Sequence, residues 1–110
     1  MANTFKNSIT GSIGTSSVVV YTCPVATSTT VIGMSVANVT ANNITVSTTL
    51  TSAAQSKTAY LIKDATVVAG GATVLIGGDQ KVVMSALDTL TVTSSAASSA
   101  DVVVSVLEIS

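Results

Sequence analysis

The most nucleophilic side chain in the sequence belongs to its single cysteine, Cys23. It follows an apolar run and closes the segment SVVVYTCP. A catalytic thiol needs a neighbouring base or cation that lowers its pKa, and the sequence contains no histidine to act as that base. We therefore expect Cys23 to be a small buried hydrophobe at the end of a strand, without a disulfide partner in the chain.

The other candidates for acid–base or metal chemistry are the five carboxylates Asp64, Asp79, Asp88, Asp101 and Glu108. All except Glu108 lie in or beside turn-forming segments, where aspartate bonds to its own backbone. No spacing brings two of them together as a catalytic pair, and Asp79 alone offers calcium little affinity. The glycine pair before Asp79 lacks the Lys-Ser/Thr and following helix of a phosphate-binding loop. We expect turn or solvated-edge roles, with no catalytic residue, metal or cofactor.

The charge content restricts the possible partners. The 110 residues suit a single domain, and only 8% of them are charged, against about 25% in an average soluble domain. Arginine is absent, and the positive charges are Lys6, Lys57, Lys63 and Lys81. Four dispersed lysines do not build the basic stripe that neutralises phosphates, so we expect no nucleic-acid partner.

The hydropathy of the chain raises the question of a membrane. Its mean hydropathy is +0.69, and 47% of its residues are hydrophobic. However, 16 serines and 18 threonines interrupt every apolar run before it reaches the roughly 18 residues of a spanning helix. The N-terminal residues, MANTFK, lack the apolar core and cleavage site of a signal peptide. We expect a soluble protein made in the cytoplasm without export, and with no membrane partner.

Apolar and polar residues alternate with a period of two through most of the chain. In the segment ITVSTTL, for example, Ile44, Val46 and Leu50 share one face and serine and threonine occupy the other. Valine, isoleucine and threonine dominate such segments, as is typical of strands, and no window has helical spacing. We expect strands at residues 17–23, 29–39, 44–51, 59–62, 66–68, 73–76, 81–84, 90–93 and 102–109.

Turn-forming residues separate these segments at intervals of about 8–12 residues. Asn42-Asn43 suits a tight hairpin because asparagine tolerates positive φ, and glycine pairs stand at 70–71 and 77–78. Short strands with regular turns predict an all-β fold, either a β-sandwich or a small barrel. We expect an antiparallel β-sandwich of about eight or nine short strands, jelly-roll or immunoglobulin-like, as one domain over residues 14–110.

The alternation also predicts a core, with Leu87 covering its end. The last strand is apolar on both faces up to Glu108, so Val103, Leu107 and Ile109 need a cover from a second layer or another subunit. Residues 1–13, with Phe5 and Ile9, form either an arm that docks on an adjacent subunit or an edge strand of the same domain. These five apolar residues are the predicted interface. The predicted core is Val18, Val20, Ile32, Met34, Val36, Ile44, Val46, Leu50, Leu61, Val82, Met84, Leu90, Val92, Val104 and Val106.

Several strand-and-turn segments together carry a family resemblance. They are residues 20–24 (VYTCP), 32–38 (IGMSVAN), 75–84 (LIGGDQKVVM), 87–92 (LDTLTV) and 99–109 (SADVVVSVLEI). With these segments, nearly the whole chain resembles small virion structural proteins of tailed bacteriophages, particularly marine and cyanobacterial ones. Such proteins commonly carry Gly-Asp before the TLTV strand, where this chain has Leu87-Asp88. The resemblance implies a β-sandwich that assembles in many copies on a particle and has no enzymatic role.

The surface composition agrees with assembly. Serine, threonine, alanine and valine cost little desolvation and little side-chain entropy on packing, and a net charge of −1 gives little repulsion between copies. We expect a virion structural protein, foremost a capsid decoration or cement protein, with copies of itself or other virion proteins such as the major capsid protein as partners. The alternatives are a neck, tail or fibre-associated subunit and a receptor- or glycan-binding module. The aromatic residues available to such a module for sugar stacking are Tyr21 and Tyr60, and we expect Tyr60 to pack in the core or an interface.

Overall fold

A computed structural model gives the positions of residues 2–77 and 81–110, which fold into nine strands and no helix. In this part of the chain no helix is long and apolar enough to cross a membrane. The expected turn at residues 77–79, and with it Asp79, extends outside the described residues. The strands are β1 (Asn3–Ile13), β2 (Val18–Thr22), β3 (Ser28–Asn38), β4 (Ile44–Ser52), β5 (Lys57–Val67), β6 (Ala72–Ile76), β7 (Val82–Met84), β8 (Thr89–Ser94) and β9 (Ala100–Ile109).

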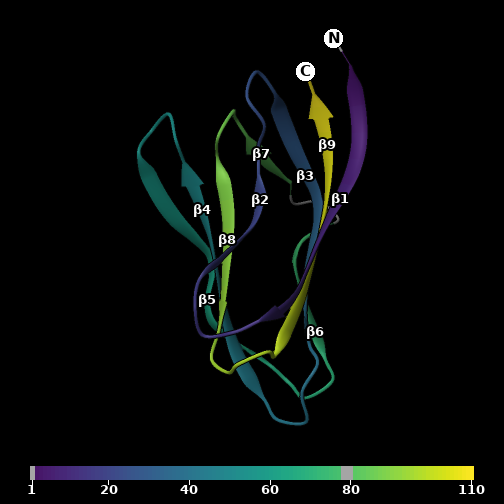
Figure 1. The fold of residues 1–110 in the computed structure, drawn as a ribbon, viewed down its shortest axis with the longest axis vertical. Helices are drawn as coiled ribbons and strands as arrows, with labels where there is room; N and C mark the ends of the chain where they lie inside the picture. Colours follow the sequence, from purple (N-terminus) through teal and green to yellow (C-terminus); the bar gives the residue numbers. More distant parts are fainter. Residues whose placement is uncertain (1, 78–80) are drawn as a thin grey trace.

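Two antiparallel sheets face each other as a sandwich (Figure 1). Sheet A has the order β1-β9-β3-β6, and β7 pairs with the other end of β3; sheet B has the order β2-β8-β4-β5. Because β6 and β7 share one position beside β3, each sheet has four positions. This is the eight-strand jelly-roll arrangement, so the predicted all-β sandwich is confirmed in its jelly-roll form.

The two chain ends lie together at one end of the sandwich, next to the start of β1 and the end of β9 (Figure 1). Ala2 and Ser110 exchange two backbone hydrogen bonds, each with an N–O distance of 3.0 Å. β1 then pairs with β9 from Asn3 to Thr10 without a register shift. Residues 3–13 therefore form an edge strand of sheet A in this structure.

Two predicted local features differ from the structure. Asn42-Asn43 does not form a hairpin, because β3 belongs to sheet A and β4 to sheet B. Instead the amide of Asn38 donates to the carbonyl oxygens of Asn42 and Val67 at 2.7 and 3.0 Å, which holds the crossing chain. The strands predicted at 59–62 and 66–68 are one strand, β5, whose irregular middle contains Asp64 at φ +50°.

The core lies between the sheets, and most predicted core residues are in it. Ile32 was predicted to point into the core, but it is only half-buried and its neighbour Val31 is buried instead. The cause is a register shift of β3 against β9 between Val31 and Gly33. A bulge of this kind is invisible to a period-two pattern. Val18, Leu50, Leu61 and Val82 are also half-buried and pack against the core. The fully buried core also contains Ile13, Val31, Val67, Ile76 and Val102, which the prediction omitted.

Leu87 does not cover the end of the core as predicted; its side chain is 55% exposed. Its backbone has φ +71°, in the left-handed region that is unfavourable for residues with a Cβ atom. The turn is held by its neighbours, since the backbone N–H of Leu87 donates to the carbonyl oxygen of Cys23 and the carboxylate of Asp88 accepts from the N–H groups of Ser85 and Ala53. Glycine would suit this left-handed backbone better than the Leu87 found here.

We therefore expect Leu87→Gly to raise the free energy of unfolding by up to about 1 kcal/mol, because glycine removes the left-handed strain while no buried contact is lost. Urea unfolding followed by circular dichroism measures the change. Leu90→Ala is the contrasting variant, because Leu90 is fully buried and its truncation should cost about 2–5 kcal/mol. Destabilisation of the protein by Leu87→Gly would show that the leucine side chain stabilises the turn.

Candidate functional site

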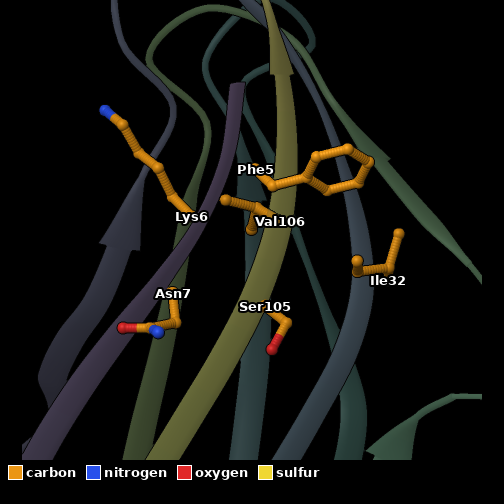
Figure 2. Close-up of a pocket in the computed structure, with 6 residues that line it drawn as sticks. All are labelled: Phe5, Lys6, Asn7, Ile32, Ser105 and Val106. Atoms are coloured by element: carbon orange, nitrogen blue, oxygen red, sulfur yellow. The ribbon is translucent and has the colours of Figure 1, made fainter. Parts of the chain in front are cut away.

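The outer face of sheet A is the side that sheet B does not cover. Along β9 the residues alternate strictly: Val102, Val104 and Val106 point into the core and are buried, while Val103 and its companions point outward. Residues paired across an antiparallel ladder share a face, so the registers of β1, β3, β6 and β7 identify the remaining members. Ile32, at the register shift of β3, lies on the same side as Phe5 (Figure 2). The residues that the registers assign to this outer face are Asn3, Phe5, Asn7, Ile9, Ser28, Thr30, Gly33, Ser35, Ala37, Ala72, Val74, Val83, Asp101, Val103, Ser105, Leu107 and Ile109.

Two rows of side chains cross this face, and each is apolar except for one hydroxyl residue on β3. In the first row, Phe5 pairs with Leu107, Leu107 with Thr30 and Thr30 with Val83. Phe5 is 74% and Val83 71% exposed. The members of the face carry one charge, Asp101, which lies at the start of β9 and accepts a hydrogen bond from the N–H of Ser12.

The second row runs parallel to the first. Ile9 pairs with Val103, Val103 with Ser35 and Ser35 with Val74. Ile9 is 71%, Val103 41% and Val74 70% exposed. Together the two rows place large apolar side chains on β1, β9, β6 and β7, while β3 contributes the hydroxyl residues Thr30 and Ser35 between them. Single exposed apolar residues are ordinary, but a contiguous set of this kind marks an interaction surface.

A shallow hollow lies between the rows, where the side chains are small. Figure 2 shows Phe5 and Ile32 extending on the same side of the sheet, above Ser105, while Lys6 points to the opposite side of β1. The hollow has a mixed lining of apolar and polar residues, and no cluster of metal-ligating groups accompanies it in the described residues.

The outer face of sheet B has a different character. Its central strands pair Thr49 with Thr91 and Thr51 with Thr89, so hydroxyl groups cover it. Some of these hydroxyls bond to one another, as Thr51 does to Thr58 at 2.9 Å. The two outer faces of the sandwich are therefore unlike: one is apolar and the other is polar but uncharged over its centre.

A polar bridge joins the two sheets near the chain ends. The Tyr21 hydroxyl, from sheet B, donates to Glu108 Oε2 of sheet A at 2.6 Å and lies 2.9 Å from Thr29 Oγ1. Lys6 of β1 pairs with the other oxygen of Glu108 at 3.0 Å. Because the Tyr21 hydroxyl has one hydrogen and donates it to Glu108, the Thr29 hydroxyl is the donor in its hydrogen bond with the tyrosine oxygen. The bridge thus fixes β2, β3, β9 and the edge strand β1 to one another.

The electrostatics of this bridge follow from burial and hydrogen bonding. The hydrogen bond from Tyr21 lowers the pKa of Glu108, burial opposes that shift, and Lys6 lowers the pKa further. Burial raises the pKa of Tyr21, and its hydrogen bond to the carboxylate raises it further. Glu108 is therefore a charged structural acceptor and Tyr21 a neutral donor, which leaves neither group free to move a proton at neutral pH.

The remaining predicted residues lie where their chemistry is structural. Cys23 is fully buried, as predicted, with its sulfur 3.2 Å from Thr29 Oγ1. Tyr60 is 56% exposed, so of its two predicted positions, core or interface, the core is excluded and the interface stays a prediction. The Lys63 ammonium group lies 5.3 Å from its ring centroid. Glu108 is buried, contrary to the solvated role expected for it.

The structure brings all five predicted interface residues, Phe5, Ile9, Val103, Leu107 and Ile109, onto one face of one sheet. Sequence reasoning missed Val74 and Val83 on that face, because their strands are short and their partners lie far away in sequence. It also missed the polar bridge. The signal for Glu108 was present, because Glu108 is in phase with the buried residues Val104 and Val106.

Comparison with known proteins shows the fold. No protein-family model matches the chain, and no curated protein matches its sequence. A chain from Bacillus endospore appendages, which form disulfide-linked pili, matches with a TM-score of 0.59 at 13% identity, over 98% of this chain and 88% of its own. A chain from infectious bursal disease virus, Gx strain, matches with a TM-score of 0.55 at 10% identity, over 96% of this chain and 36% of its own. The β-sandwich is thus shared with proteins of a pilus and of a virus.

We expect Tyr21→Phe to lower the free energy of unfolding by about 1–3 kcal/mol at pH 7, because it leaves one buried oxygen of Glu108 without its donor. Urea unfolding measures the loss. Tyr60→Phe, which removes the same hydroxyl from an exposed tyrosine, is the matched control and should change little. Equal effects of the two substitutions would contradict a stabilising role for the bridge.

The same bridge predicts acid sensitivity. The folded-state pKa of Glu108 is depressed, so its contribution to stability is fully present above the unfolded carboxyl value of about 4.3 and is lost as pH falls through the folded pKa. The free energy of unfolding measured from pH 7 down to pH 3 should therefore fall more steeply in the native protein than in Glu108→Gln. Parallel pH profiles would show that Glu108 titrates normally in the folded protein.

Proposed function

We propose that this chain is a structural subunit of a bacteriophage virion, and that it binds the capsid as a decoration or cement protein. The observation that carries the proposal is the apolar outer face of sheet A, which the chain leaves uncovered across its strand positions. The sequence resemblance to small virion proteins of tailed phages supports the same role. So does a fold shared with chains of a virus and of a pilus.

The contacts of such a subunit have to be non-covalent. The chain has one cysteine, and Cys23 is buried in the core, so no thiol is available on the surface for a link between subunits. Apolar contact is the remaining strong source of association, because only 8% of the residues are charged. The flat face of sheet A provides that contact, and its shallow hollow between Phe5 and Ile32 provides a place for a side chain of the partner.

The site supports structural binding better than catalysis or sugar recognition. The buried acid is held by Tyr21 and Lys6, which positions Glu108 for stability rather than for proton transfer. Sugar sites usually present stacking aromatic rings, and here Tyr60 stands on the hydroxyl-rich side of the sandwich with the Lys63 ammonium group 5.3 Å from its ring centroid. A single ring occupied in this way is a weak platform for a sugar.

The proposal is tested by binding to particles from the phage that encodes the chain. Purified chain is mixed with particles stripped of it, and bound copies are counted by quantitative mass spectrometry. We expect hundreds of copies per particle. Val103→Asp should weaken binding by at least about tenfold, since it buries an unpaired charge in the contact. Its unfolding midpoint should stay close to that of the native chain, because Val103 is not in the core.

Thr91→Asp places the same charge on the outer face of sheet B and is the matched control. It should bind particles like the native chain. Loss of binding in Thr91→Asp with retention in Val103→Asp would assign the contact to the other face and contradict the proposal. A copy number of only a few per particle would contradict the capsid location and favour the neck or tail.

A further inference from the structure

The edge of β1 carries free backbone groups. β1 occupies the outermost position of sheet A, beside β9 (Figure 1). Ala2 and Ser110 exchange both of their hydrogen bonds, and in an antiparallel ladder such bonded pairs recur at every second residue. The even-numbered residues of β1 are therefore the ones bonded to β9. Asn3, Phe5, Asn7 and Ile9 turn their N–H and C=O groups away from the sheet.

Apart from Lys6, whose ammonium group is paired with Glu108, the segment of this edge from Asn3 to Thr10 lacks the devices that usually protect an exposed strand. From Asn3 to Thr10 its pairing with β9 shows no register shift, and the segment contains no proline. The edge of sheet B at β5 differs, because its pairing with β4 is interrupted twice and Asp64 adopts φ +50° within it. The long, regular edge of β1 is suited to accept another strand.

The side chains of β1 suit a second copy of β1 in particular. Phe5 and Ile9 are the exposed large apolar residues of the strand, whose third, Ile13, is buried in the core; Asn7 lies midway between Phe5 and Ile9. In an antiparallel pair centred on Asn7, Phe5 lies opposite the partner's Ile9 and Ile9 lies opposite the partner's Phe5. The same register places Lys6 opposite the partner's Ser8, so that the two lysines do not face each other. The sequence of the strand is thus complementary to itself.

We propose that two copies of the chain associate through antiparallel pairing of β1 with β1, with the two-fold axis at Asn7. The backbone groups of the odd-numbered residues supply the hydrogen bonds, and the crossed pairs of Phe5 with Ile9 set the register. The two A sheets become one continuous sheet, and their outer faces join into one apolar surface. The pairing itself does not depend on the proposed function. That the joined apolar surface faces the capsid does rest on it.

Sedimentation velocity over a range of micromolar concentrations tests the pairing. The native chain should be a dimer. Asn7→Pro should be a monomer with an unchanged β-sheet circular dichroism spectrum, since it removes an outward N–H that the fold does not use. Ile9→Thr should weaken the dimer at least tenfold, while Val25→Thr, which alters a residue 70% exposed outside the strands, should not. A native chain that stays monomeric at every concentration overturns the proposal.

Disulfide trapping tests the register. Asn7→Cys places two thiols opposite each other at the two-fold axis, with Cα atoms about 5.5 Å apart, which suits a disulfide. It should cross-link under mild oxidation, and Ile9→Cys should not, because its thiol faces the partner's Phe5. The native Cys23 is buried and serves as the uncross-linked background. Cross-linking of Ile9→Cys alone, or growth of open polymers, overturns this pairing. A monomer that still binds phage particles overturns the dimer alone, whereas a dimer that binds none contradicts only the capsid role.

Discussion

Sheet A carries large apolar side chains on both of its faces, and the described residues provide one sheet to cover it. On the inner side Val102, Val104 and Val106 pack against sheet B and leave no exposed surface of consequence. On the outer side Val103 and Leu107 belong to the same strand and have no layer above them within the described residues. This apolar surface in water is the physical reason to expect that the protein associates with another molecule.

The rest of the structure holds the strands of that outer face together. β9 lies between β1 and β3, and Glu108 at its end is held by Tyr21 of the other sheet and by Lys6 of the edge strand. The bridge is a mixed one. The buried tyrosine–carboxylate bond is its strong part, whereas Lys6 is 53% exposed and contributes little through an ion pair that water screens. A residue that looks like a candidate acid in the sequence thus serves to anchor the edge from which the apolar face begins.

The sequence predicts much of this architecture because alternation is a local signal. Strand positions, the jelly-roll class as one of two alternatives and the burial of Cys23 follow from period-two patterns and turn residues. What the patterns miss depends on backbone irregularities or on distant pairing. A register shift beside Gly33 puts Ile32 out of phase, the left-handed backbone at Leu87 turns its side chain to solvent, and Asn42-Asn43 connects two sheets rather than two paired strands. Glu108 was open to prediction, since its phase along β9 already pointed inward.

The central claim is that the outer face of sheet A is the contact surface of the assembled protein. Cryo-electron microscopy of the intact particle tests it most directly, because it shows which side of each sandwich carries neighbouring density. The account predicts density packed over Val103 and Leu107, with the threonines of sheet B turned to solvent. A map in which those threonines form the contact while Phe5, Ile9 and Val103 remain in water would contradict it.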